Sequence, residues 1–363
     1  MIKKLLISFI LFLSVISLNA QRVQVLDNEG VPIPFVTVTT PDGKYVASTD
    51  IDGWFDVADG NTTITLSQVA YKTLTLEATD IKGGKIVLED ATYDLPEVVV
   101  KPKELIYGQT YFRLTYIDDN GPIYYRGGVI DNTYEIAKKK VSAKSRHISK
   151  AEFGIIRFVV DRLVGKFDRF SCLPEFSYYQ KLLQMRDNGE ITITDASNGR
   201  QVIADDVSPL GYIYWDKNER TRTVSFDMFK YDKHQKEAKK RAKAEKKGKA
   251  YEADTTMSID GTIYQVYRTD SVGNSRVEDF VMSQYTQLGH HKRQNADYII
   301  QLQSFAADYA YIDKKEYKKL RKDNKVEMNI KELRQFEKNN NIPPLAPNIL
   351  EQINKLFEKD LSQ

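Results

Sequence analysis

The sequence predicts an α+β protein, in which a seven-stranded antiparallel β-sandwich is followed by a mixed domain of antiparallel sheet with flanking helices. Three observations lead to this prediction. Residues 22–89 contain short segments of alternating apolar and polar residues, separated by turns that contain glycine. Longer strand-like segments and turn clusters follow residue 104, and apolar residues at helical spacing occupy the C-terminal end. An antiparallel sheet flanked by helices is the simplest architecture for this order of elements.

The first twenty residues are expected to be an export signal. Lys3 and Lys4 provide a positive start, residues 5–18 are almost purely apolar, and small residues before Gln21 favour cleavage there. The apolar stretch is shorter than the ~20 residues that a membrane-spanning helix needs, so no transmembrane span is expected after cleavage. No cysteine stands directly after the stretch, at the cleavage position, so lipid attachment is not expected either. This predicts a periplasmic or outer-membrane-associated protein.

Composition limits the kinds of partner and chemistry. The chain has 363 residues, with 53 Lys and Arg against 50 Asp and Glu, and a formal net charge of +3. A charge so close to zero, together with export, predicts no nucleic-acid partner. Cys172 is the single cysteine, so it cannot form an internal disulfide. Its neighbours Phe170 and Leu173 favour a buried structural role over a catalytic one.

The N-terminal domain is expected to span residues 21–90, with its core formed by Phe55, Leu66 and Leu74. A tight turn at Asp52-Gly53 precedes Trp54 and Phe55. Asp50 and Asp52 could bind calcium, but hydrogen bonds to their own turn backbone are favoured, because a calcium loop recruits more oxygen ligands. The seven predicted strands are 22–27, 34–40, 45–49, 54–57, 62–69, 72–78 and 85–89.

This domain resembles the carboxypeptidase-regulatory-like family, a transthyretin-type sandwich of secreted and outer-membrane proteins in Bacteroidota. The residues that carry the resemblance are Val25, Asp27, Gly30, residues 32–38, residues 49–55, Ser67 and Tyr71. Val23 and Ala70 stand where the family usually has glycine. The resemblance implies an accessory or adaptor role without peptidase activity, and it covers about one fifth of the chain.

Residues 91–103 are expected to be a linker with a short strand. Residues 95–100 resemble the segment that joins the same domain to the plug of TonB-dependent receptors. The rest of the chain is too short and too rich in lysine for the membrane domain of such a receptor. An ordinary interdomain strand is therefore favoured over one that pairs with another sheet.

Residues 104–363 are expected to form one α+β domain with a charged insert at 230–250. The turn cluster at 118–122 predicts a hairpin between 110–117 and 123–136. A helix broken near Pro174 is expected over 155–185. Further strands are predicted at 191–194, 201–204, 211–215, 221–229, 257–267 and 276–282. Helices are predicted at 314–322, 330–339 and 349–357.

The insert is the strongest compositional feature. Its alanines and lysines favour a helix, but no apolar stripe lets it pack into a core. A solvated or partly disordered segment that projects from the sheet and adds little to folding is therefore the first interpretation. The functional hypothesis is contact with an anionic surface, such as lipopolysaccharide phosphates, acidic glycan or anionic lipid. The candidate contact residues are Lys239, Lys240, Arg241, Lys243, Lys246, Lys247 and Lys249.

No pattern predicts catalytic, cofactor-binding or metal-binding residues. The histidines His147, His234, His290 and His291 lack metal-ligand spacing, and no nucleophile or phosphate-binding motif occurs. A catalytic pair of carboxylates distant in sequence stays open. The 22 tyrosines are expected to be structural strand residues more than a glycan-binding or peptide-binding surface.

These observations together predict a non-enzymatic, exported envelope protein that needs no cofactor. Its β-sandwich is expected to act as an adaptor for a protein or glycan partner. Two alternatives are a periplasmic carrier of lipid or another hydrophobic ligand, with a curved sheet, and a peptide or glycan hydrolase. An apolar cavity in the C-terminal sheet would favour the carrier, and a cleft with facing carboxylates the hydrolase.

Overall fold

The computed structural model describes most of the chain, which divides into two units. The first unit holds the described residues up to Pro41 together with Val46–Asp90, and the second holds Asp42–Tyr45 and the described residues from Ala91 onward. Both units are rich in antiparallel sheet, and helices occur mainly in the second, so the class is mixed α+β. The described residues are 21–57, 63–91, 104–136, 140–142, 147–153, 178–196, 199–216, 220–248, 261–268, 279–291, 296–323 and 328–360.

The first unit contains two sheets, with strand orders β4-β1-β7 and β3-β2-β5-β6. Every strand lies where the alternating pattern predicts one. The β1–β7 pair is parallel, so the expectation of a wholly antiparallel arrangement is wrong at this edge. The strands are β1 (Gln21–Leu26), β2 (Thr37–Thr39), β3 (Tyr45–Ser48), β4 (Trp54–Val57), β5 (Thr63–Ser67), β6 (Leu74–Glu77) and β7 (Lys85–Val87), with a short 3₁₀ helix at Ala78–Asp80.

Both sheets contribute to one hydrophobic core. Val25 and Phe55 of the first sheet are in the same buried cluster as Val38 and Leu66 of the second. Phe55 and Leu66 are buried, as predicted. Leu74 is only partly buried against this cluster, because it lies on the edge strand β6.

The Asp52-Gly53 turn is formed by Asp50. Its Oδ1 accepts hydrogen bonds from the backbone N–H groups of Asp52 (2.9 Å) and Trp54 (2.8 Å). Gly53 has a φ of +77°, and a Cβ there would lie 2.6 Å from the Val25 carbonyl oxygen. The prediction that Asp50 serves the turn is confirmed, and glycine is required by both the backbone angle and the close approach.

The second unit contains an 11-stranded sheet with order β10-β9-β8-β18-β17-β16-β15-β14-β13-β12, and with β11 paired to β9. From β12 to β18 each strand is antiparallel to the next one in sequence, and β18 then pairs with β8. The strands are β8 (Leu105–Asp118), β9 (Gly121–Glu135), β10 (Lys140–Ser142), β11 (His147–Phe153), β12 (Thr192–Asp195), β13 (Arg200–Ala204), β14 (Pro209–Asp216), β15 (Thr221–Phe226), β16 (Gly261–Arg268), β17 (Phe280–His291) and β18 (Ala296–Ile312).

The predicted hairpin is confirmed as β8 and β9, which pair from Leu105 to Asp118 with one register shift between Tyr116 and Ile117. The long strand β18 was not predicted, and β17 extends nine residues beyond the predicted end at 282. These strands carry buried glutamine, serine and threonine among their apolar residues, so the alternating pattern is weak. The strand predicted over 221–229 is wrong in its last three residues, because a helix starts at Met228.

The three helices predicted at the C-terminal end are confirmed as α5, α6 and α7. In the region predicted helical over 155–185, the structure describes the helix from Tyr178 onward. The preceding residues, with Cys172 and Pro174, lie outside the described residues. The helices are α3 (Tyr178–Asp187), α4 (Met228–Glu245), α5 (Lys314–Asp323), α6 (Ile330–Asn339) and α7 (Pro347–Asp360). Among the described residues, no helix combines the length and apolar character needed to cross a membrane.

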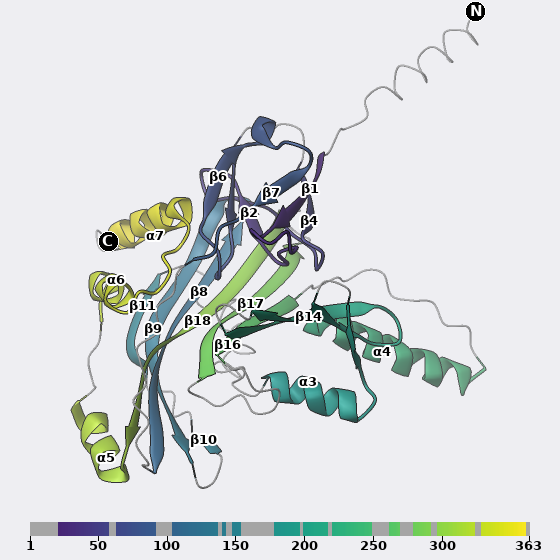
Figure 1. Cartoon of the computed structure of the whole chain (residues 1–363). Helices are drawn as coiled ribbons and strands as arrows, with labels where there is room; N and C mark the ends of the chain where they lie inside the picture. The colour runs from purple at the N-terminus through teal and green to yellow at the C-terminus, as the bar shows by residue number, and fades with distance from the viewer. Residues whose placement is uncertain are drawn as a thin grey trace, which may run out of the picture. The chain divides into compact units, whose positions relative to one another are not determined.

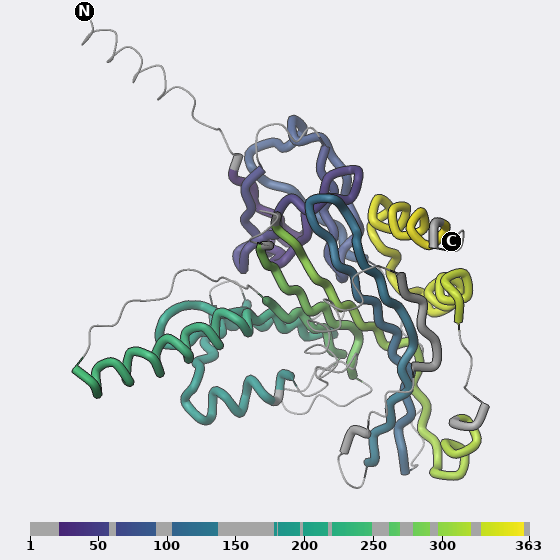
Figure 2. Tube along the Cα trace, turned by 180° about the vertical axis from the view of Figure 1, so that it is seen from behind, coloured from purple at the N-terminus to yellow at the C-terminus, as the bar shows by residue number. Residues whose placement is uncertain are grey.

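The helices cover different parts of the large sheet. α3 places Tyr178, Tyr179 and Leu182 in a buried cluster with residues of β13 to β18. α6 and α7 lie beside β9 and β11 in both views of the backbone (Figures 1 and 2). α5 follows β18 at the end of the long strands, whereas α4 follows β15 and runs outward from the sheet (Figure 1).

Candidate functional site

Four of the seven candidate contact residues lie on α4, namely Lys239, Lys240, Arg241 and Lys243, and the start of this helix is determined locally. The Asp227 side chain accepts a 2.8 Å hydrogen bond from the backbone N–H of Lys230, which caps the first turn. The Asp227 backbone N–H donates to the Leu210 carbonyl at 2.7 Å. The chain therefore leaves β15 and enters the helix without an intervening loop.

The first turns of α4 are packed against the sheet. The Phe229 ring occupies the space over Gly261 of β16, where an added Cβ would come within 1.7 Å of that ring. Tyr231 lies 6.2 Å from Phe226, ring centre to ring centre, and its hydroxyl donates to Glu190 Oε2 at 2.8 Å. Burial, and next the hydrogen bond to Glu190, raise the pKa of Tyr231 to about 12, so the phenol stays a donor at neutral pH.

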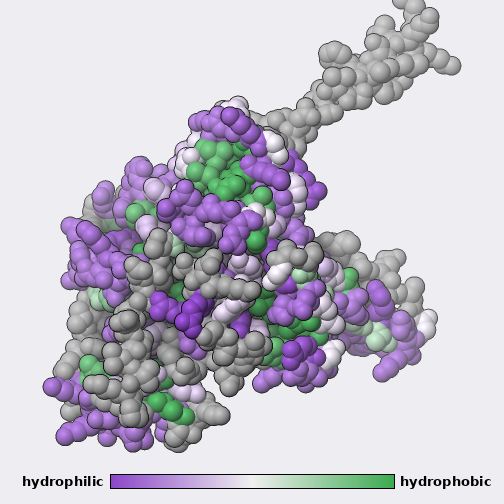
Figure 3. All heavy atoms as spheres, viewed as in Figure 1, coloured by the Kyte–Doolittle hydropathy of each residue, from purple (hydrophilic) through white to green (hydrophobic). Residues whose placement is uncertain are grey.

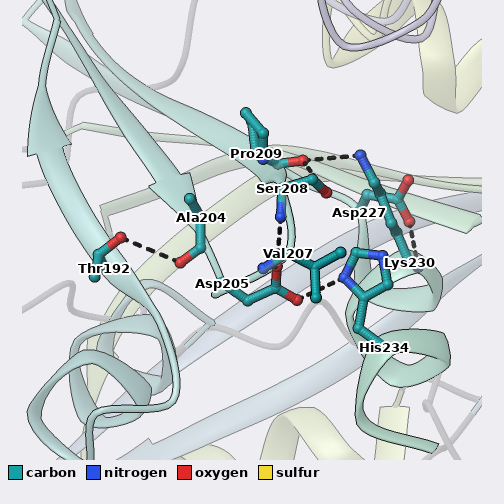
Figure 4. A network of polar contacts seen from close by, with 9 residues as sticks. All are labelled: Thr192, Ala204, Asp205, Val207, Ser208, Pro209, Asp227, Lys230 and His234. Carbon is teal, nitrogen blue, oxygen red and sulfur yellow. Dashed lines mark hydrogen bonds and ion pairs between the residues drawn. The ribbon is translucent and has the colours of Figure 1, made fainter. Parts of the chain in front are cut away.

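A polar network fastens the next turn of α4 to the β13–β14 connection (Figure 4). His234 Nδ1 lies 2.6 Å from Asp205 Oδ2, and Asp205 Oδ1 accepts the backbone N–H groups of Val207 (3.0 Å) and Ser208 (2.9 Å). Lys230 Nζ donates to the Pro209 carbonyl at 3.0 Å. Burial opposes ionisation of Asp205, but these hydrogen bonds outweigh it and lower the pKa of the carboxyl.

The network contains Ser, His and Asp side chains, but their geometry is not that of a catalytic triad. The bonds of Lys230 and His234 to Pro209 and Asp205 are called here the α4 clamp. Ser208 Oγ donates to the Pro209 carbonyl at 3.3 Å, and His234 is bonded to Asp205 (Figure 4). A nucleophilic serine would instead need its hydroxyl within hydrogen-bond reach of the histidine. These bonds hold the first turns of α4 in a fixed orientation on the sheet.

Beyond the clamp, α4 is exposed to solvent. Six of the seven predicted contact residues are described, and all six are exposed: Lys239, Lys240, Arg241, Lys243, Lys246 and Lys247. Lys249 lies outside the described residues. Glu237 offsets one of these charges through a 3.2 Å ion pair with Lys240. Figure 3 shows mainly hydrophilic side chains over the outer part of this helix.

The structure corrects two expectations about this segment. The described residues form one helix from Met228 to Glu245, so a disordered loop is the wrong description of them. The prediction that 230–249 projects from the sheet needs correction at its start, because Tyr231 and His234 bond to other elements. Tyr231 and His234 are three residues apart and therefore share a helix face, a signal that the sequence contained.

A second polar cluster, called here the α6 cluster, consists of Tyr111, Tyr125, Arg334 and Glu337. The Tyr111 hydroxyl donates to Glu337 Oε1, which also accepts from Arg334 Nη1 at 2.6 Å. The two tyrosine hydroxyls lie 3.3 Å apart, and the Arg334 guanidinium lies 5.2 Å from the centre of the Tyr125 ring. Burial is the main cause that raises the pKa of both tyrosines, so each stays protonated. The cluster joins α6 to β8 and β9, and no sequence spacing pointed to it.

Six tyrosines that stand close together in pairs along the sequence are structural. All of them are buried, either on strands of the sheet or on α3: Tyr107, Tyr111, Tyr124, Tyr125, Tyr178 and Tyr179. This confirms the preferred interpretation of these tyrosines as core and strand residues. Among the described residues, no three His, Cys, Asp or Glu side chains are grouped as metal ligands would be.

Comparisons with known proteins identify no relative that carries a function. No family model matches the chain, and no curated protein matches it. Among solved structures, the chain is similar to a protein of unknown function from the DUF3598 family of Nostoc punctiforme. The identity is 9%, over 79% of this chain and 96% of that chain, and the TM-score is 0.14. A similarity this slight does not extend to the fold.

Proposed function

We propose that this chain is an exported, non-enzymatic protein of the cell envelope, in which the first unit is an adaptor and α4 contacts an anionic surface. The observation that carries the proposal is the division of α4 into a clamped end and an exposed basic end. A basic segment that only improved solubility would not need a phenylalanine packed over a strand glycine, a tyrosine–glutamate bond and an Asp–His pair to fix its direction.

The charge distribution supports a local contact more than a global one. The whole chain is nearly neutral, yet the outer part of α4 concentrates lysine on one face. Lys236, Lys239, Lys240 and Lys243 follow spacings of three and four residues, which bring them together on a helix. The 18 residues of α4 make a helix about 27 Å long, longer than the ~10 Å over which exposed charges are screened at 0.1 M salt.

The target we favour is a surface that carries phosphate, either lipopolysaccharide or anionic phospholipid. The lysine face of α4 has no large apolar side chain that could insert into hydrocarbon, which suits a contact at the level of the head groups. Lysine ammonium groups act as point charges and bind phosphate without a fixed two-bond geometry.

The adaptor role of the first unit rests on its architecture and on the resemblance of its sequence. Seven strands in two sheets around a common core are compatible with a transthyretin-type sandwich of the carboxypeptidase-regulatory-like family. In this proposal the unit binds a protein or glycan partner in the envelope. Its export depends on the signal at residues 1–20, and N-terminal sequencing of the mature protein should find Gln21 first.

The surface contact is tested by replacing Lys239, Lys240 and Lys243 with glutamine in the full-length mature protein. Sedimentation with lipopolysaccharide, and separately with vesicles of phosphatidylglycerol and phosphatidylcholine, should show weaker binding by the variant. Replacement of the same residues with arginine keeps the charge and should retain binding. Binding of the glutamine variant at wild-type strength, or binding that does not fall with added salt, would contradict the proposal.

A further inference from the structure

A pattern of five residues on α4 is repeated on α5. Residues 236–240 read Lys-Glu-Ala-Lys-Lys and residues 315–319 read Lys-Glu-Tyr-Lys-Lys. In both, the lysines stand at positions i, i+3 and i+4, which share one face of a helix. Both segments are helical in the structure, so both present three lysines in the same arrangement.

α5 is attached to the sheet by the face opposite these lysines. Tyr317 and Leu320 pack against a buried cluster formed by Leu105, Tyr107 and Ile312 at the ends of β8 and β18. The Tyr107 and Tyr317 rings are 6.2 Å apart, centre to centre. The helix is thus fixed to the scaffold by its apolar side, and its lysines point outward.

The start of α5 is capped by acidic side chains. Asp313 Oδ1 accepts the backbone N–H groups of Lys315 (2.8 Å) and Glu316 (2.7 Å). Glu316 Oε2 in turn accepts the backbone N–H of Asp313 at 2.9 Å. This reciprocal arrangement is a capping box, so the glutamate in the repeated pattern serves the helix end here.

The lysines of the α5 pattern have unbalanced charge. Lys315, Lys318 and Lys319 are exposed, and none of them forms an ion pair with another described residue. Like charges at these spacings destabilise a helix. An external anion would relieve this repulsion. Figure 3 shows hydrophilic side chains at the lower left, where Figure 1 places α5.

We infer that Lys315, Lys318 and Lys319 form a second contact for the surface that α4 is proposed to bind, and that this surface is an anionic phospholipid bilayer. The inference rests on the proposed function of α4 and makes its target more specific. α4 and α5 leave different parts of one sheet, and both backbone views show them well apart (Figures 1 and 2). A small phosphate ligand could not reach both lysine groups, whereas an extended layer of head groups could.

Two contacts on one sheet should act together. Once one helix is bound, the other is held near the same bilayer, and its binding becomes an intramolecular step. A lysine near an anionic membrane contributes about 1 kcal/mol, which is about a fivefold change in affinity. Removing three charges from either helix should therefore lower the affinity for vesicles by about a hundredfold, and removing both groups should abolish sedimentation.

The experiment uses the full-length mature protein and vesicles of phosphatidylglycerol and phosphatidylcholine. Pure phosphatidylcholine vesicles, which carry no net charge, are the comparison. The α5 variant carries Lys315→Gln, Lys318→Gln and Lys319→Gln, and the α4 variant carries Lys236→Gln, Lys239→Gln and Lys240→Gln. Replacement of each set with arginine is the charge-conserving control. We expect the two glutamine variants to lose affinity to a similar extent and the arginine variants to bind like wild type.

The outcomes separate this inference from the proposed function. If the α4 variant loses affinity and the α5 variant binds like wild type, the second contact is wrong and the function of α4 stands. If the α5 variant loses affinity for lipopolysaccharide but the wild type does not bind phosphatidylglycerol vesicles, the bilayer is the wrong surface. If neither glutamine variant differs from wild type, the proposed function fails as well.

Discussion

α4 and α6 contact the sheet in a similar way, but their glutamate–cation pairs have different roles. Each helix rests on a strand glycine, and each carries a glutamate three residues from a cation. In α6 the glutamate is buried, bonded to Arg334 and Tyr111, and lies beneath the helix. In α4 the glutamate partners Lys240, whose side chain is 53% exposed, beyond the clamped turns.

The difference shows how to distinguish a charge that supports the fold from one that is available to a partner. Burial in the α6 cluster makes the loss of either ionic partner costly, so its residues are tied to the fold. The lysines of outer α4 are exposed, and an exposed ion pair contributes little to stability. Substitutions on the two helices should therefore separate stability from surface binding.

The largest expected effect is the loss of the buried glutamate. Glu337→Ala would leave Arg334 without its anion and the Tyr111 hydroxyl without its acceptor, and should reduce the free energy of unfolding by about 3 kcal/mol. The matched substitution Glu237→Ala should cost less than about 1 kcal/mol, because its pair with Lys240 is more exposed. Urea unfolding of both variants measures this difference in the free energy of unfolding. Equal decreases for the two variants would contradict the prediction.

The glycines beneath the two helices should respond alike. A Cβ at position 127 would lie 2.5 Å from the Tyr125 hydroxyl oxygen and 2.6 Å from a Leu333 methyl carbon, and one at position 261 would collide with the Phe229 ring. Gly127→Ala and Gly261→Ala should each cost about 1–3 kcal/mol by overpacking. The melting temperatures of the two variants test this. Gly189→Ala would not be a suitable control, because the positive φ of Gly189 makes any side chain there strained. If Gly261→Ala melts like wild type, then α4 is not docked through Phe229.

The α4 clamp should weaken in acid. The pKa of Asp205 is lower in the folded protein than the ~3.9 expected for an unfolded chain, because hydrogen bonds stabilise its ionised form. That stabilisation is present above the unfolded pKa and is lost as the pH falls through the lower, folded value. Asp205→Asn should cost about 1 kcal/mol at pH 5. The difference from wild type should shrink toward pH 3, and a difference that grows in acid would contradict this sign.

The smallest effect is expected from trimming the exposed end of α4. Replacing 236–248 with a short Gly-Ser connection should change the free energy of unfolding by less than about 0.5 kcal/mol, because no core contact is removed. Replacing 230–249 should cost clearly more, since it also removes Tyr231 and His234. Parallel thermal melts compare the two deletions, and equal melting temperatures would show that the clamp adds nothing to stability.

Much of the fold could be predicted because local patterns were strong. The seven N-terminal strands, the β8–β9 hairpin and α5 to α7 follow from turn residues and from apolar spacing. β18 escaped prediction because buried residues such as Gln301, Gln303 and Ser304 interrupt the alternation of its apolar residues. Their burial depends on neighbouring strands that are distant in sequence, which a local pattern does not include.

The mixed α+β class, the turn at Asp50 and the basic character of α4 follow from the sequence alone, because each depends on residues close together in the chain. Tertiary contacts instead determine where the packed turns of α4 end and its exposed turns begin. That boundary depends on Glu190 and Asp205, which lie 41 and 29 residues from their partners Tyr231 and His234. The α6 cluster likewise joins Tyr111 to Glu337 across 226 residues. A contact between such distant residues depends on how the strands pair, and local propensity does not contain that information.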